Sequence, residues 1–91
     1  MAFSLTPLAR EELAAYQLDR SVYLGLLNIY HAEVPAFVTD TRRRLNSMRD
    51  GVPHLIVRLN YFGHVYVADF WLEIQVGGST WFCTKVEIYR N

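Results

Sequence analysis

The sequence has little of several features that would point to a specific chemistry. Its 91 residues include one cysteine, Cys83, so no disulfide can form within the chain, and nine basic residues are balanced by nine acidic ones. A chain without net charge has no general attraction to nucleic acid or to an anionic membrane. We therefore expect neither as the partner, and the lone thiol fits a reducing compartment.

Motifs for metal, cofactor or membrane binding are also missing. The three histidines form no i, i+4 pair and Cys83 has no second thiol near it, so we expect no metal and no cofactor. The most apolar run, from Val22 to Tyr30, is far shorter than the roughly 20 residues of a membrane helix. The start of the chain lacks the pattern of a signal peptide. These absences predict a cytoplasmic protein that does not act on a membrane.

Apolar residues, by contrast, are plentiful. They make up 52% of the chain, and 14% of the residues are aromatic. That content argues against disorder, and the length predicts one domain over residues 1–91 that buries about 60 to 65% of its unfolded surface.

The stretch from His54 to Asn91 predicts a three-stranded antiparallel meander, because its residues alternate in polarity with a period of two. We expect the core-facing set of the middle strand to be Tyr66, Ala68, Phe70, Leu72, Ile74 and Val76. We expect Phe82, Thr84, Val86 and Ile88 of the last strand to face the core, with Trp81, Cys83, Lys85, Glu87 and Tyr89 facing outward.

The register follows from opposing core residues to core residues. Leu59 then pairs with Tyr66, and either a two-residue turn, Phe62-Gly63, or a four-residue turn from Asn60 to Gly63 keeps the same faces. We favour the longer turn, because Phe suits a primed turn poorly. A three-residue loop from Gly77 to Ser79 pairs Ile74 with Phe82 in the second hairpin.

The first half of the chain predicts helices that cover one face of the sheet, which gives an α+β fold. Thr6-Pro7 is a helix start, and Ala2 to Leu5 could add a short edge strand. Polar residues from Asp19 to Ser21 leave open whether residues 7–32 form one bent helix or two, with Ser21 as the second cap. Pro35 predicts a break near Ala32 and a further helix that ends before Gly51, with Phe37, Thr41, Leu45 and Met48 on one side.

Two charged groups invite functional hypotheses. The register opposes Asp69 to Glu87, and paired carboxylates can serve acid-base chemistry or bind a cation. The alternative is a two-residue slip that pairs Glu73 with Lys85 as an ion pair. The second group is an alternative binding surface for phosphates, formed by Arg42, Arg43, Arg44 and Arg49. Consecutive arginines fan over about 200° of a helix, so we favour a solvated helix face.

The segment from Phe3 to Leu13, FSLTPLAREEL, resembles the opening of the small RelE/ParE toxins of toxin-antitoxin pairs. The order of strand, helix pair and three-strand meander is similar too, as is Val57-Arg58-Leu59 followed by Tyr66. This resemblance implies a toxin that acts on RNA or gyrase. In its ribonuclease members, Arg, Lys and His residues lie on the sheet, and Arg58, Lys85 and Arg90 are the candidates here.

We favour a non-enzymatic protein-binding or inhibitor function, in analogy to small phage and mobile-element inhibitors such as anti-CRISPR proteins. The prediction places two tryptophans on a solvent-facing side of the sheet, where large apolar side chains commonly mark an interaction site. Trp, Tyr and Arg often dominate binding energy. The alternative is that the N-terminal segment or Arg90 covers the tryptophans. We expect the outward face to bind a protein partner or a second copy of the chain, through the residues Trp71, Trp81, Tyr89, Arg58, Lys85 and Val67.

Overall fold

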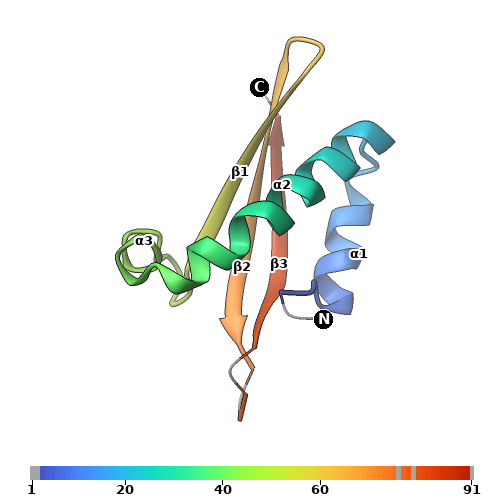
Figure 1. The fold of residues 1–91 in the computed structure, drawn as a ribbon. Coiled ribbons are helices and arrows are strands. Elements are labelled where there is room, and N and C mark those ends of the chain that lie inside the picture. The colour runs from blue at the N-terminus through green and yellow to red at the C-terminus, as the bar shows by residue number, and fades with distance from the viewer. Residues whose placement is uncertain (1–2, 76, 79, 91) are drawn as a thin grey trace.

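The computed structural model describes residues 3–75, 77–78 and 80–90. Three helices precede three strands, as the sequence predicts (Figure 1). The helices are α1 (Pro7–Ala15), α2 (Arg20–Thr39) and α3 (Thr41–Asn46), and the strands are β1 (His54–Tyr61), β2 (His64–Ile74) and β3 (Trp81–Arg90). The strands form one antiparallel sheet in the order β1-β2-β3. The α+β fold class is confirmed.

The first hairpin has the predicted strand register but a shorter turn than we favoured. Leu59 lies opposite Tyr66, and the pairing continues to Tyr61 opposite His64, which leaves the two residues Phe62 and Gly63 as the turn. Both have positive φ, 47° and 80°, as a primed turn requires. Phe62 is 86% exposed, so no packing contact opposes this conformation, and the strand pairing determines the turn.

The second hairpin departs from the predicted register near its loop. Asp69 lies opposite Glu87, as expected, but a β-bulge between Trp71 and Leu72 shifts the pairs beyond it by one residue. Leu72 therefore opposes Cys83, and Ile74 opposes Trp81 rather than Phe82. A shift of one residue exchanges the two faces of a strand, so the first residues of β3 lie on the opposite faces from those predicted. Val76 and Ser79 of the expected loop and core set lie outside the described residues.

Residues 7–32 form two helices, which answers a question that the sequence left open. Thr6 caps α1, and its side chain accepts a hydrogen bond from the backbone N–H of Ala9 at 3.2 Å. Asp19, rather than Ser21, caps α2, with its carboxylate 2.9 Å from the Ser21 nitrogen. An acidic side chain is preferred at this position because it also complements the helix dipole.

The prediction that Pro35 ends a helix is wrong, because α2 continues through it to Thr39. Proline removes one hydrogen bond to the carbonyl four residues earlier, here that of His31. Both Pro35 and His31 are exposed, so water can satisfy that carbonyl. The predicted third helix is reduced to α3, which Asp40 caps through the Arg43 N–H at 3.0 Å.

The core lies between α2 and the inner face of the sheet, with α1 beside β3 (Figure 1). One side of α2 is buried at spacings of three and four residues, and Phe70 of β2 is buried with it, as expected. The Tyr30 ring of α2 stacks on Phe70 with ring centroids 4.4 Å apart, and its hydroxyl donates to the Phe3 carbonyl at 2.7 Å. The predicted core positions Leu24, Leu45 and Met48 are exposed.

The N-terminal segment runs along the free edge of β3. The Phe3 and Thr6 amides donate to Trp81 and Cys83 carbonyls at 3.0 and 2.9 Å, and the Cys83 amide donates to Ser4. One parallel bridge, between Leu5 and Cys83, is the observed form of the predicted edge strand, of which Ala2 lies outside the described residues. The β3 edge is thereby paired at its beginning, from Trp81 to Cys83.

Candidate functional site

The sheet face opposite the helices, called the outer face below, consists of three cross-strand rows. They are His54-Trp71-Lys85, Ile56-Asp69-Glu87 and Arg58-Val67-Tyr89. Five of the six residues predicted to bind a partner share this face: Arg58, Val67, Trp71, Lys85 and Tyr89. The structure thus places most of the predicted binding residues on one face.

Trp81 is the sixth, and its predicted position is wrong. The bulge turns Trp81 and Cys83 to the inner side, where Trp81 packs partly buried against the core. The Arg44 guanidinium of α3 lies 5.7 Å from the centre of its ring. Arg44 therefore covers part of the Trp81 ring, and the Phe3 amide of the N-terminal segment bonds to the Trp81 carbonyl.

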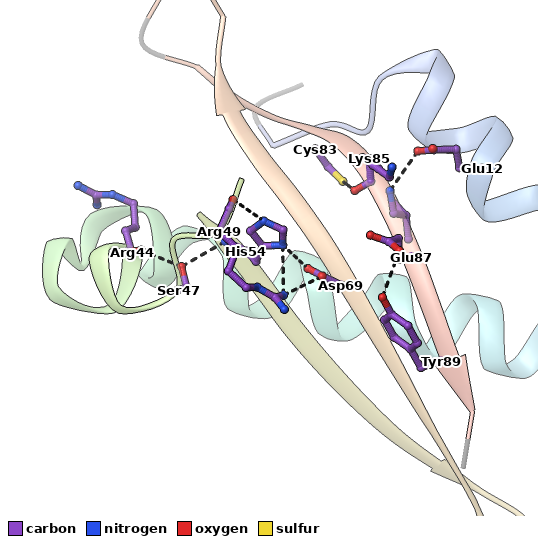
Figure 2. A network of polar contacts seen from close by, with 11 residues as sticks. Glu12, Arg44, Ser47, Arg49, His54, Asp69, Cys83, Lys85, Glu87 and Tyr89 are labelled. Atoms are coloured by element: carbon purple, nitrogen blue, oxygen red, sulfur yellow. Dashed lines mark hydrogen bonds and ion pairs between the residues drawn. The ribbon is translucent and has the colours of Figure 1, made fainter. Parts of the chain in front are cut away.

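A charged network occupies the middle of the outer face (Figure 2). Asp69 is buried, and one carboxylate oxygen lies 2.9 Å from the Arg49 guanidinium while the other lies 2.8 Å from Nδ1 of His54. Arg49 comes from the connection between α3 and β1 and reaches across β1 to make this contact. The network therefore ties that connection to the sheet.

His54 is buried with both ring nitrogens in use. Its Nε2 lies 3.0 Å from the Arg49 carbonyl oxygen, and its Nδ1 faces the Asp69 carboxylate. Both partners carry hydrogen-bond acceptors. The Arg49 guanidinium also lies 3.3 Å from Nδ1. Neither nitrogen is free to exchange a proton with a substrate.

The Asp69-Glu87 hypothesis is changed by these contacts. The two carboxylates are opposite one another, so the slip that would pair Glu73 with Lys85 does not occur. Asp69, however, has Arg49 and His54 as partners, and Glu87 accepts a hydrogen bond from the Tyr89 hydroxyl at 3.1 Å. The Arg49 guanidinium compensates the charge of Asp69, which removes the basis for mutual carboxylate repulsion.

Trp71 is held within the outer face rather than projecting from it. Its ring lies 4.5 Å from that of His54, and the Lys85 ammonium is 4.9 Å from the ring centre. Its indole nitrogen is buried and has no hydrogen-bond partner among the described residues. Trp71 thus covers the charged network on one side.

The accessible part of the outer face surrounds Tyr89. Tyr89 is 52% exposed and Ile56 38% exposed, and Arg58 is exposed beside them. They line a depression of about 380 Å³ together with Val67, Asp69 and residues from the end of α3 and the connection to β1. The hydrogen bond to the Glu87 carboxylate, which the protonated phenol donates, raises the pKa of Tyr89.

Cys83 is not the outward thiol that its alternation predicted. It is buried, and its Sγ donates to the Lys85 carbonyl at 3.3 Å. Burial raises the pKa of its thiol to about 12, so the thiol is protonated and unreactive near neutral pH.

The four arginines of the alternative surface do not share one solvated helix face. Arg43 pairs with Glu33 of α2 at 3.2 Å. Arg44 donates to the Val38 carbonyl and lies over Trp81, and Arg49, which follows α3 in the sequence, binds Asp69. Arg42 alone makes no side-chain hydrogen bond or ion pair within the described part of the chain. Three of these residues therefore fasten α3 and the connection after it.

The sequence analysis missed Arg49 and His54 as members of the outer face. One signal could have found His54, because the correct register places it opposite Trp71. Arg49 lies before β1, and its position depends on how the chain turns between α3 and β1. The alternation of polar and apolar residues in the strands does not predict this turn.

Comparisons with known proteins add no family. No family model matches the sequence, and no curated protein or solved structure shows a significant match. Within the described residues, no group of three or more His, Cys, Asp or Glu side chains is placed to hold a metal ion. No helix in that part of the chain is long and apolar enough to cross a membrane.

Proposed function

We propose that this chain is a small non-enzymatic protein that binds another protein through the accessible part of its outer face. The observation that carries the proposal is the group of Ile56, Arg58, Val67 and Tyr89 around one depression, on the sheet face opposite α2 (Figure 1). Exposed apolar groups next to Arg and Tyr are typical of binding surfaces.

The rigidity of this surface supports the proposal. Arg58, on β1, and Tyr89, on β3, lie in one cross-strand row with Val67 of β2 between them. The contact between Arg49 and Asp69 holds the residues of the adjacent row in place. A surface held in one conformation loses little entropy when it binds. An inhibitor of the anti-CRISPR kind would act in this way, by covering part of its target.

The state of the titratable groups favours binding over catalysis. The His54 nitrogens and the Asp69 carboxylate are taken up by each other and by Arg49, and the Cys83 thiol is buried. General acid-base catalysis needs a group within reach of the substrate proton. Tyr89 and Arg58 can contact a partner without any such step.

Single substitutions on the two faces test the proposal. We expect Tyr89→Ser and Ile56→Ser each to weaken partner binding by about 2 kcal/mol, the size of a binding hot spot, with the fold retained. The measurement is the amount of partner retained by the immobilised chain from a lysate of its host. The control is Leu24→Ser, which alters a residue of α2 that is 40% exposed. Retention that only the Leu24 variant loses would place the binding surface on the helices.

A RelE/ParE-like toxin is the second candidate, and one observation favours it. Arg49, His54, Arg58 and Tyr89 line the same depression, and basic and aromatic groups could hold an RNA strand there. This function requires the strand to displace the Asp69 carboxylate or the Arg49 carbonyl from His54, because these two acceptors hold both ring nitrogens. Expression of the chain alone should then arrest growth, and Arg58→Glu should remove the arrest. Normal growth of the host would exclude this candidate.

A further inference from the structure

The two edges of the sheet differ in how many of their outward backbone groups are hydrogen-bonded to the rest of the chain. Along β3, the Phe3 to Thr6 segment supplies backbone hydrogen bonds, and the Glu12 carboxylate of α1 accepts from the Val86 amide at 3.2 Å. Along β1, the His54 amide is bonded outward, to the Ser47 hydroxyl at 3.2 Å. No other described residue bonds to the outward side of β1 from Ile56 onward.

The register shows which backbone groups this leaves open. A two-residue turn makes Tyr61 and His64 a hydrogen-bonded pair, and hydrogen-bonded pairs alternate along an antiparallel ladder. The N–H and C=O groups of Ile56, Arg58 and Asn60 therefore point away from β2. An open edge of this kind is a template for another strand, and β1 has neither a proline nor a bulge to prevent pairing.

We propose that this edge pairs with the same edge of a second copy of the chain. A two-fold axis perpendicular to the sheet would join the two β1 strands antiparallel and form one continuous six-stranded sheet. Such pairing keeps the helices of both copies on the same side and the two outer faces on the other. The inference goes beyond the proposed function, because it concerns the backbone edge of β1. Ile56 and Arg58 belong to this strand and to the depression, whereas Tyr89 lies on β3, at the far edge of each sheet.

One position of the axis satisfies the open groups best. An axis at Ile56 would place Arg58 opposite His54 of the second copy, and an axis at Val57 would place Asn60 opposite it. The His54 amide is already bonded within its own chain and could not pair. An axis at Arg58 would oppose the two Arg58 guanidinium groups, and like charges directly opposite destabilise a sheet.

An axis at Leu59 avoids both problems. It places Arg58 opposite Asn60 of the second copy, and these positions exchange the open backbone hydrogen bonds. On the inner side it places Leu59 opposite Leu59 of the second copy, and both are partly exposed, so that apolar side chains meet across the junction. The second copy is thus complementary to the open stretch in backbone, charge and polarity.

Exposed apolar side chains at the two ends of β1 agree with this arrangement. Phe62 at the turn is 86% exposed, and Leu45 and Met48, beside the start of β1, are 65% and 43% exposed. Antiparallel pairing brings the turn of each copy toward the α3 end of the other. Phe62 of one copy would then approach Leu45 and Met48 of the second copy.

Charge changes at Asn60 test both the edge and the register. Asn60→Asp places a carboxylate across from Arg58 and should tighten the dimer, whereas Asn60→Lys opposes like charges and should loosen it. Because each change occurs twice in the dimer, we expect a roughly three- to tenfold change in Kd in each direction. The measurement is sedimentation velocity over a concentration series, with circular dichroism to verify that each variant is folded.

The matched control changes the charge of the same hairpin away from the open edge. His64 is exposed at the start of β2, so His64→Asp and His64→Lys should leave the dimer Kd unchanged. A parent chain that stays monomeric throughout the concentration series would overturn the proposal. A dimer that responds equally to both Asn60 variants, or more to those of His64, would overturn it as well.

Discussion

The residues of the outer face have different environments although they alternate along the same strands. Asp69 is 3% exposed and Tyr89 is 52% exposed, and both belong to the outward set of the sheet. The difference arises because Arg49 reaches over one row and not over the next. Alternation gives the face of a residue, whereas the residues that cover this face come from elsewhere in the chain.

Removing Asp69 tests whether the charged network stabilises the fold. Asp69→Ala leaves His54 buried without its carboxylate partner, and we expect it to lower the free energy of unfolding by about 3 kcal/mol. The measurement is urea unfolding. The control is Glu87→Ala, the neighbour across the sheet, which is half-buried and should change stability by less than about 1 kcal/mol. Equal stability of the parent and the Asp69 variant would show that the network contributes nothing to the fold.

At the scale of elements, the alternating strands and the start of α1 at Thr6-Pro7 could be predicted, whereas the other helix boundaries could not. Leu59 opposite Tyr66 and Asp69 opposite Glu87 follow from matching apolar faces. The bulge after Trp71 left no mark in the pattern, because Phe82 and Cys83 are both apolar enough to face inward. Pro35 was misleading for a similar reason, since an exposed proline can remain within a helix whose other side is buried.

The short helix α3 offers an element-scale prediction, because Arg44 attaches it to the rest of the fold. Arg44→Glu loses the hydrogen bond to the Val38 carbonyl and the contact with the Trp81 ring, so we expect a loss of about 2 kcal/mol in unfolding free energy. Arg42→Glu makes the same charge change at an exposed position and should cost less than about 0.5 kcal/mol. Thermal unfolding of both variants is the measurement, and equal losses would contradict the role given to Arg44.

For the whole molecule, the arrangement of layers determines which surface remains accessible. The helices cover the inner side, and the N-terminal segment with Glu12 covers the β3 edge from Trp81 to Val86. The outer face and the β1 edge remain. The sequence predicted the outer face through Tyr89 and Arg58. It could not predict the open β1 edge, because that depends on which parts of the sheet the rest of the chain covers.

Photo-crosslinking from single positions in living host cells tests the central claim most directly. A photoreactive phenylalanine analogue replaces Tyr89 in one variant and Leu24 in the other, so that the probe lies on the outer face or on α2. The account predicts a discrete crosslinked product, with a mass other than twice that of the chain, from position 89 and none from position 24. Products from position 24 with none from position 89 would contradict it.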